Sequence, residues 1–282
     1  MKIIKSLIAA AMMLPLGAVA QTEPTDTVTV FMIGDSTMAN KPLDKENQER
    51  GWGQMLPLYF RGAVKIDNHA VNGRSSKSFR SEGRWDKVME KLRPGDYVII
   101  QFGHNDEKIK SQDRYSEPGG TFDANLKRYV EETRSKGATP ILMNSIVRRN
   151  FPPTATAVHQ DNDDNPPVGP TKETEGGFIL VDTHGAYVTA PPRVAEETGT
   201  TFIDMNKLTH KLVQEMGPTL SREMFMWIPA GTYEFCPKGK TDNTHLNVLG
   251  GILVSRLAAN ALAEQVPGLR KYIRPEVYNL NK

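Results

Sequence analysis

Ser36 is the first residue whose type and setting could support covalent chemistry. It follows a run of β-branched and aromatic residues at 28–33, the composition of a buried strand, and a break at Gly34. A serine at the carboxyl end of the first strand of an α/β sheet lies where such folds bind their ligands. Its hydroxyl becomes an effective nucleophile only when a base removes the proton. The alternative is that Asp35 or Ser36 simply caps a helix at a strand-to-helix turn.

Asp242 and His245 are the candidates for that base. They stand immediately before the last predicted helix, and their spacing of three predicts side chains on the same side of one helical turn. Asp242 would then accept a hydrogen bond from one imidazole nitrogen and leave the other to take the Ser36 proton, which is the logic of a serine triad. The alternative is a helix cap beside a surface histidine.

Two further loops carry candidate hydrogen-bond donors. Gly73 follows the second predicted strand, and only glycine lets a backbone N–H approach a substrate oxygen unobstructed. Asn105 follows the third. Because loops after parallel strands lie at one edge of the sheet, the N–H groups of Ser36 and Gly73 and the Asn105 amide would form a three-donor oxyanion hole. Losing one such donor typically costs ~3–4 kcal/mol of transition-state stabilisation.

The elements that must position these residues alternate between strand and helix, which predicts right-handed crossovers and a parallel sheet. The last helix has the strongest pattern, with Asn247 as its cap; Thr121 is expected to cap another. Strands are predicted at 27–33, 64–68, 96–103, 140–146 and 201–204, and helices at 52–60 (ended or kinked by Pro57), 84–92, 121–136, 185–198 and 205–216. The predicted face of the last helix comprises Leu249, Ile252, Leu253, Arg256, Leu257, Asn260 and Ala261.

Two long segments do not fit the alternation. Residues 148–177 are rich in Pro, Gly, Asp and Asn and too long for a structureless connector. They are interpreted as a surface excursion near the mouth of the site, with room for a hairpin. Residues 217–241 are interpreted in the same way, but they are more aromatic.

The first twenty residues have the pattern of a targeting segment. Lys2 and Lys5 precede an apolar run at 7–16, and residues 18–20 form a small-residue cleavage site. The run is too short to span a bilayer, and no Cys follows it to carry a bacterial lipid anchor. The sequence therefore predicts a signal peptide at 1–20, one domain at 21–282, and export to the periplasm or the medium.

Composition narrows the classes of partner. The formal charge is +2, from 35 basic and 33 acidic residues, and the charges are interspersed. This favours neither nucleic acid nor an anionic membrane as a partner. The lone Cys236 cannot form an intrachain disulfide, so packing alone must stabilise an exported chain.

Together, these blocks resemble the SGNH or GDSL-type hydrolases. The four matching blocks are Gly34-Asp35-Ser36, Gly73, Gly103-His104-Asn105-Asp106 and Asp242-Asn243-Thr244-His245. The Gly-x-Ser-x-Gly signature of elbow-type lipases is absent. Within the superfamily the sequence is similar to rhamnogalacturonan acetylesterases. The similar segments are Ile33–Ala39, Gly51–Gln54, Asn72–Ser76, Phe102–Asp106 and Asp242-x-x-His245.

The resemblance implies a single three-layer α/β/α domain with a short, flavodoxin-like parallel sheet. It also implies a secreted, cofactor-free esterase that removes acetyl groups from pectic polysaccharide. No metal is expected, because the histidines at 69, 159, 184 and 210 show no metal-ligand spacing. The resemblance assigns Ser36 as nucleophile, His245 as base, Asp242 as its orienting carboxylate, and Gly73 and Asn105 as oxyanion donors.

Other roles stay open at the level of sequence. His104 and Arg74 are candidates for substrate contact, although a structural hydrogen bond and a solvated arginine are the alternatives. The alternative functions are an esterase acting on xylan or another acetylated sugar, and a non-catalytic carbohydrate-binding protein with the same fold.

Overall fold

The computed structural model describes residues 27–151 and 178–278. Five parallel strands form its central sheet in the order β2-β1-β3-β4-β5. In chain order they are β1 Val28–Gly34, β2 Val64–Asn68, β3 Tyr97–Gln101, β4 Thr139–Met143 and β5 Thr201–Ile203. The order reverses between β1 and β3, and sheets of this kind bind ligands outside the carboxyl ends of the strands at that point.

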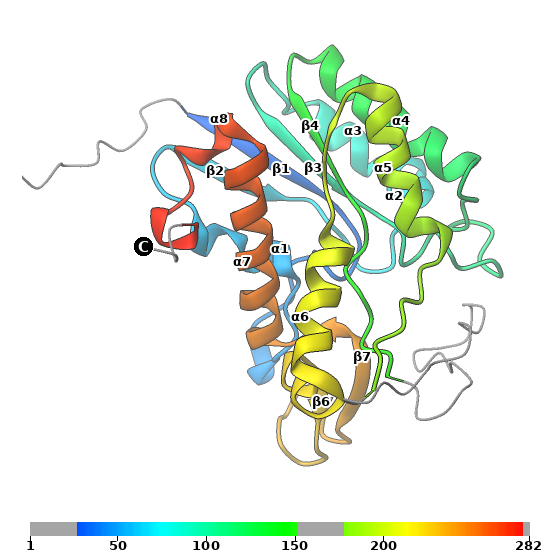
Figure 1. Cartoon of the computed structure of the whole chain (residues 1–282), viewed down its shortest axis with the longest axis vertical. Helices are drawn as coiled ribbons and strands as arrows, with labels where there is room; N and C mark the ends of the chain where they lie inside the picture. The colour runs from blue at the N-terminus through cyan, green and yellow to red at the C-terminus, as the bar shows by residue number, and fades with distance from the viewer. Residues whose placement is uncertain (1–26, 152–177, 279–282) are drawn as a thin grey trace, which may run out of the picture.

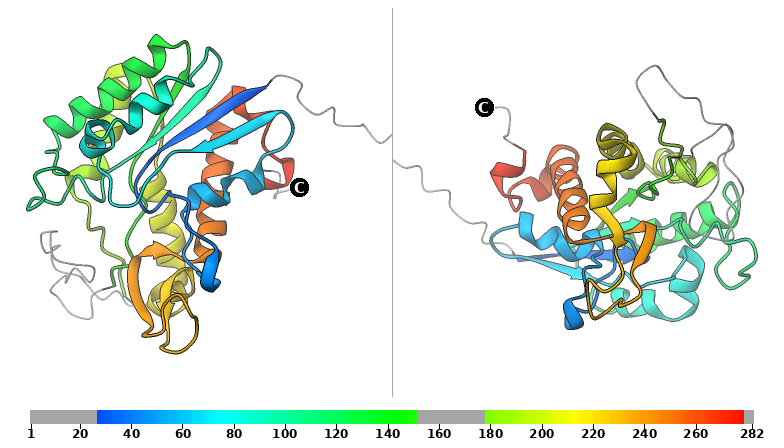
Figure 2. Two further views of the ribbon diagram at one scale, coloured as in Figure 1. Left: turned by 180° about the vertical axis from the view of Figure 1, so that it is seen from behind. Right: turned by 90° about the horizontal axis from the view of Figure 1, so that it is seen from below.

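Helices cover both faces of the sheet (Figure 1). One face packs against α1, α6 and α7, and the other packs against α2, α3, α4 and α5, as the view from behind also shows (Figure 2). The helices are α1 Trp52–Met55, α2 Ser76–Ser81, α3 Arg84–Met89, α4 Thr121–Ser135, α5 Ala186–Thr198, α6 Met205–Leu220, α7 Val248–Gln265 and α8 Pro267–Arg270. The predicted three-layer α/β/α architecture with a short parallel sheet is confirmed.

The central strand β3 shows why the sheet forms as predicted. Val98 and Ile100 point into the core beneath α2–α5, whereas Ile99 points into the core beneath α1, α6 and α7, and all three are fully buried. A strand covered on both faces has no polar side, which explains its unbroken apolar run.

Several helices begin, end or are capped differently from the prediction. Helix α2 was not predicted; it begins at a capping box in which Ser75 and Ser78 each accept from the other's backbone N–H. Thr121 does not cap α4, because its hydroxyl instead accepts from the N–H of Glu117 in the preceding turn. The helix predicted at 52–60 divides between Met55 and Leu56, just before Pro57, into α1 and the 3₁₀ helix Leu56–Tyr59.

The last helix, α7, has its predicted cap but not its predicted face. Asn247 accepts from the N–H of Gly250 at 3.0 Å. The side buried against the sheet is made mostly of small residues, whereas Leu249 is 44% exposed. A Cβ on Gly250 would lie 2.0 Å from the carbonyl oxygen of Met224. Helix α7 therefore lies closer to the backbone of Met224 than any residue larger than glycine would allow at this position. The periodicity of large apolar residues was therefore the wrong guide to this face.

The second of the two long segments is not simply a surface excursion, and most of the first lies outside the described residues. Residues 148–151 are buried, and residues 152–177 lie outside the described residues. The second segment contains the end of α6, the 3₁₀ helix Ser221–Met224 and strand β6, Phe225–Ile228. Strand β6 pairs in antiparallel fashion with β7, Lys240–Leu246, and its Phe225 and Met226 are buried. This hairpin lies beyond the carboxyl edge of the main sheet (Figure 1).

The predicted signal peptide at 1–20 lies outside the described residues. It stays a prediction, as do the domain bounds 21–282. Over 27–151 and 178–278, no helix combines the length and apolar character needed to cross a bilayer.

Candidate active site

Ser36 lies in a tight turn directly after β1. The backbone carbonyl of Asp35 accepts from the N–H groups of Met38 and Ala39 at 3.2 and 3.0 Å, which closes the turn. The Asp35 carboxylate accepts from the N–H and the hydroxyl of Thr37 at 2.9 and 2.8 Å. Asp35 and Thr37 are buried, whereas Ser36 between them is half-buried. The turn thus anchors its flanking residues and leaves the Ser36 hydroxyl at the surface of the site.

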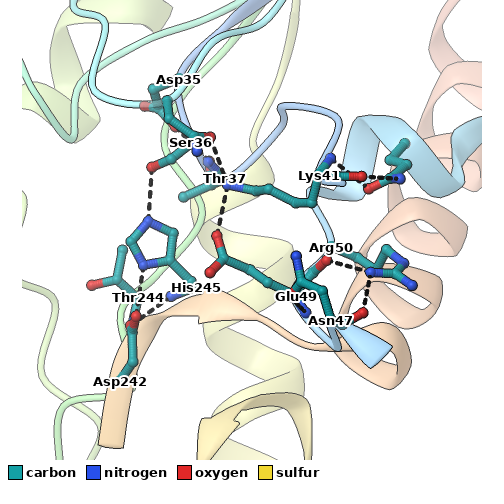
Figure 3. Close-up of polar contacts among 12 residues, drawn as sticks. Asp35, Ser36, Thr37, Lys41, Asn47, Glu49, Arg50, Asp242, Thr244 and His245 are labelled. Atoms are coloured by element: carbon teal, nitrogen blue, oxygen red, sulfur yellow. Dashed lines mark hydrogen bonds and ion pairs between the residues drawn. The ribbon is translucent and has the colours of Figure 1, made fainter. Parts of the chain in front are cut away.

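The structure brings Ser36 together with His245 and Asp242 (Figure 3). The Ser36 Oγ lies 2.9 Å from His245 Nε2, and His245 Nδ1 lies 2.7 Å from Asp242 Oδ2. Nδ1–H donating to the carboxylate leaves Nε2 to accept from the serine hydroxyl, which is the tautomer that a general base requires.

The prediction that Asp242 and His245 share a helical turn is wrong. Both lie on β7, where the pairing with β6 passes from Phe225 opposite Leu246 to Met226 opposite Asp242. Residues 243–245 therefore bulge out of the ladder. The Asp242 Oδ1 accepts from the N–H groups of Thr244 and His245 at 2.8 and 2.9 Å, and this local turn brings the two side chains together.

Arg149 and Trp227 hold the centre of this bulge. The Oδ1 of Asn243 accepts from the guanidinium of Arg149 and from the indole N–H of Trp227, both at 2.9 Å. The backbone N–H of Arg149 also donates to the carbonyl of Asn243 at 2.8 Å. Burial, together with the positive charge of Arg222 nearby, lowers the pKa of the Arg149 guanidinium to about 10. Sequence reasoning missed this clamp, because Arg149 and Asn243 are far apart in the chain.

The predicted oxyanion donors lie on neighbouring loops. Gly73 has a φ of +75°, a conformation that strains other residues, and a Cβ placed there would meet nothing within 4 Å. The space that a side chain would occupy at this position is therefore open. The Asn105 Nδ2 donates to the carbonyl of Arg74 at 3.2 Å, which fixes the amide and leaves its second hydrogen for another acceptor.

Electrostatics keep the Asp242 carboxylate ionised. Burial opposes ionisation, but hydrogen bonding to His245, the charge of His245 and the charge of Lys240 together hold the pKa of Asp242 well below its usual range. Lys240 Nζ lies 3.0 Å from Asp242 Oδ2. In the same site, burial raises the pKa of Asp35 despite its hydrogen bonds from Thr37.

His104 and Arg74 make contacts within the protein. His104 is 3% exposed, and its ring packs edge-on against His184 with centroids 4.5 Å apart. Burial lowers the pKa of His104 well below its usual value, and the electrostatic effects of His184 and Arg148 lower it further, so the ring is neutral. Arg74 Nε lies 2.9 Å from Glu82. Among the described residues neither ring nitrogen of His104 has a hydrogen-bond partner, so the structural hydrogen bond offered as its alternative role is not found. For Arg74 an ion pair replaces simple solvation.

His104, Glu107 and His184 form a buried cluster with metal-ligand side chains. Their ligand atoms lie within 4.8 Å of one another. However, the guanidinium of Arg148 donates to Glu107 and lies 3.3 Å from His184 Nδ1. A metal ion would have to displace this internal cation, so these residues do not fit a metal as they are arranged.

Comparison with known proteins identifies the family. The sequence profile of the GDSL-like Lipase/Acylhydrolase family matches residues 32–250. The chain is 32% identical over 237 residues to rhamnogalacturonan acetylesterase RhgT of Bacillus subtilis, which covers 84% of this chain and 90% of that protein. It is 28% identical to the probable rhamnogalacturonan acetylesterase YesY of the same organism, over 83% of this chain and 92% of that protein.

Solved structures share the fold. YxiM of Bacillus subtilis superposes with a TM-score of 0.62 at 24% identity, over 86% of this chain and 57% of that one. An acetylxylan esterase of Geobacillus stearothermophilus gives a TM-score of 0.54 at 16% identity, over 89% of this chain and 96% of that one. The profile match spans most of the chain, including the Ser36 turn and the Asp242–His245 bulge, and the chain therefore belongs to the GDSL-like lipase/acylhydrolase family of carboxylic ester hydrolases.

Proposed function

We propose that this protein is an exported serine esterase that removes O-acetyl groups from pectic polysaccharide. The observation that carries the mechanism is the contact of 2.9 Å between Ser36 Oγ and His245 Nε2, with Asp242 behind the imidazole. The acetylated substrate class is supported by the similarity to RhgT, a rhamnogalacturonan acetylesterase. The proposed location rests on the predicted signal peptide.

In the proposed reaction, Ser36 Oγ attacks the acetyl carbonyl while His245 takes its proton. The carbonyl oxygen becomes an oxyanion held by the N–H groups of Ser36 and Gly73 and by the Asn105 amide. When the tetrahedral intermediate collapses, the sugar oxygen leaves with the proton from His245, and the acetyl group stays on Ser36. Water then attacks the acetyl group while His245 takes its proton. Collapse of this second tetrahedral intermediate breaks the bond to Ser36 Oγ, which takes the proton back from His245, and acetic acid leaves and ionises to acetate. The residues described here supply every proton transfer in this cycle.

Acetate release from acetylated rhamnogalacturonan, compared with acetylated xylan, tests both mechanism and substrate. The wild type is expected to prefer rhamnogalacturonan, and Ser36→Ala to lower kcat by about 10⁴-fold or more, as removal of a triad member does elsewhere. Equal release by wild type and Ser36→Ala contradicts the mechanism. Faster release from xylan contradicts the pectic substrate, and binding without release supports a non-catalytic carbohydrate-binding protein.

A further inference from the structure

A chain of charged side chains, partly or fully buried, leads away from the triad to the loop that carries Gly73. Lys240 Nζ lies 3.0 Å from Asp242 Oδ2 and 3.0 Å from Glu49 Oε2. The other oxygen of Glu49 lies 2.7 Å from Lys41 Nζ, and Lys41 Nζ donates to Asn72 Oδ1 at 2.6 Å. Asn72 directly precedes Gly73. The chain therefore begins at the carboxylate behind His245 and ends beside an oxyanion donor.

The segment that carries Lys41 and Glu49 is fixed at both ends. The amide side chain of Gln54 accepts from the backbone N–H of Lys41 and donates to its carbonyl, both at 3.0 Å. Glu49 forms an antiparallel bridge with Asn247, and the N–H of Arg50 donates to the carbonyl of Leu246 at 2.9 Å. Figure 3 shows Lys41 and Glu49 meeting beside His245.

Burial explains why these ionic contacts can fix geometry. The side chain of Lys41 is 2% exposed and that of Glu49 is 17% exposed. Burial lowers the pKa of Lys41, and the neighbouring Glu49 carboxylate opposes that effect. Buried ion pairs gain little net stability over apolar packing, but removing one partner leaves a stranded charge, so such pairs fix the relative positions of the groups that they join.

We propose that Lys240, Glu49 and Lys41 form a positioning network. The network fixes the position of the Asp242 carboxylate relative to the loop that carries Asn72 and the oxyanion donor Gly73. This proposal rests on the esterase function proposed above. Lys240 supplies Asp242 Oδ2 with a second donor besides His245 Nδ1, and so fixes the rotation of the carboxylate. Lys41 holds Asn72, and Glu49 joins the two lysines. The network acts through other residues and does not touch the reacting atoms.

Hydrolysis of p-nitrophenyl acetate by a set of variants tests the proposal. Lys240→Met and Glu49→Gln are each expected to lower kcat at least ~10-fold, with KM within about twofold. Lys240→Arg restores most of the loss. The double variant loses less than the product of the single losses, because both act through one network. Lys238→Met, at an exposed lysine just before β7, is the matched control with wild-type kinetics.

Unchanged kcat in Lys240→Met overturns the proposal, as does a loss that Lys240→Arg does not restore. Lys240 is one-third exposed, so this variant decides the question even where Glu49→Gln does not fold. The proposed function has a separate readout. If wild type and Ser36→Ala hydrolyse the ester equally, the serine mechanism fails; if only Lys240→Met behaves as wild type, the network alone fails.

Discussion

The Asp242 carboxylate accepts hydrogen bonds at both oxygens. Oδ1 accepts from the N–H groups of Thr244 and His245, and Oδ2 lies close to His245 Nδ1 and Lys240 Nζ. A carboxylate with this many donors remains ionised and cannot rotate without losing several of them. The imidazole that it orients is therefore held in one direction, toward Ser36.

The Asn105 amide provides the clearest prediction at the scale of a single residue. Asn105→Ala should lower kcat by about 10²–10³-fold with little change in KM, because an oxyanion donor acts mainly in the transition state. Asn260→Ala on α7, whose amide donates to Glu264, is the control. Steady-state kinetics on p-nitrophenyl acetate measure the effect. A rise in KM at unchanged kcat would place Asn105 in substrate binding instead.

The individual residues of the site were predictable because each stands beside a recognisable strand end or helix start. Ser36, Gly73, Asn105 and His245 follow or precede strong local patterns. Lys240 and Glu49 have no such signal. They are ordinary charged residues, and only the folded chain brings them within 3.0 Å of each other.

At the scale of elements, the hairpin β6–β7 sets the position of His245, the proposed base. The sequence predicted a helical turn because a spacing of three fits one, and a bulge in a strand produces the same proximity by a different route. No local sequence pattern predicts such a bulge. It depends on Asn243, which is buried and held by Arg149 and Trp227 from elsewhere in the chain.

Asn243→Ala tests whether this clamp shapes the site. The change removes an acceptor from the buried guanidinium of Arg149 and the half-buried indole of Trp227, so the free energy of unfolding should fall by about 1–3 kcal/mol. At temperatures where the variant remains folded, kcat should also fall, because the bulge that aligns His245 loosens. Urea unfolding and kinetics measure the two effects, with Thr241→Ala at an exposed position of β7 as the control. Normal kcat in a destabilised variant would show that the contacts of Arg149 and Trp227 with Asn243 contribute to stability and not to the geometry of the site.

At the scale of the whole molecule, the parallel sheet was predictable because its buried strands are continuous apolar runs between helical patterns. The buried face of α7 was not, because close packing through Gly250 depends on the position of Met224 in space. The same limit applies to the ionic cluster of Glu107, Arg148 and His184, which joins three separate segments of the chain.

That cluster should control stability in acid. Arg148 and His184 overcome the effect of burial and lower the pKa of Glu107 from 4.5 to about 2. A lowered pKa stabilises the fold above about pH 4.5, and this contribution, about 3 kcal/mol, is lost as the pH falls toward 2. Glu107→Gln should be less stable at neutral pH and lose less stability on acidification. Unfolding monitored between these pH values tests this, with the exposed Glu264→Gln as the control; an unchanged acid slope would contradict it.

The account as a whole depends on Ser36 carrying the acetyl group during turnover. Rapid acid quenching of the enzyme during hydrolysis of p-nitrophenyl acetate, followed by peptide mass spectrometry, measures this directly. The account predicts one acetyl group on the peptide that contains Ser36, and none on that peptide from His245→Ala under the same brief exposure. Acetylation of a different residue at the rate of turnover would contradict it.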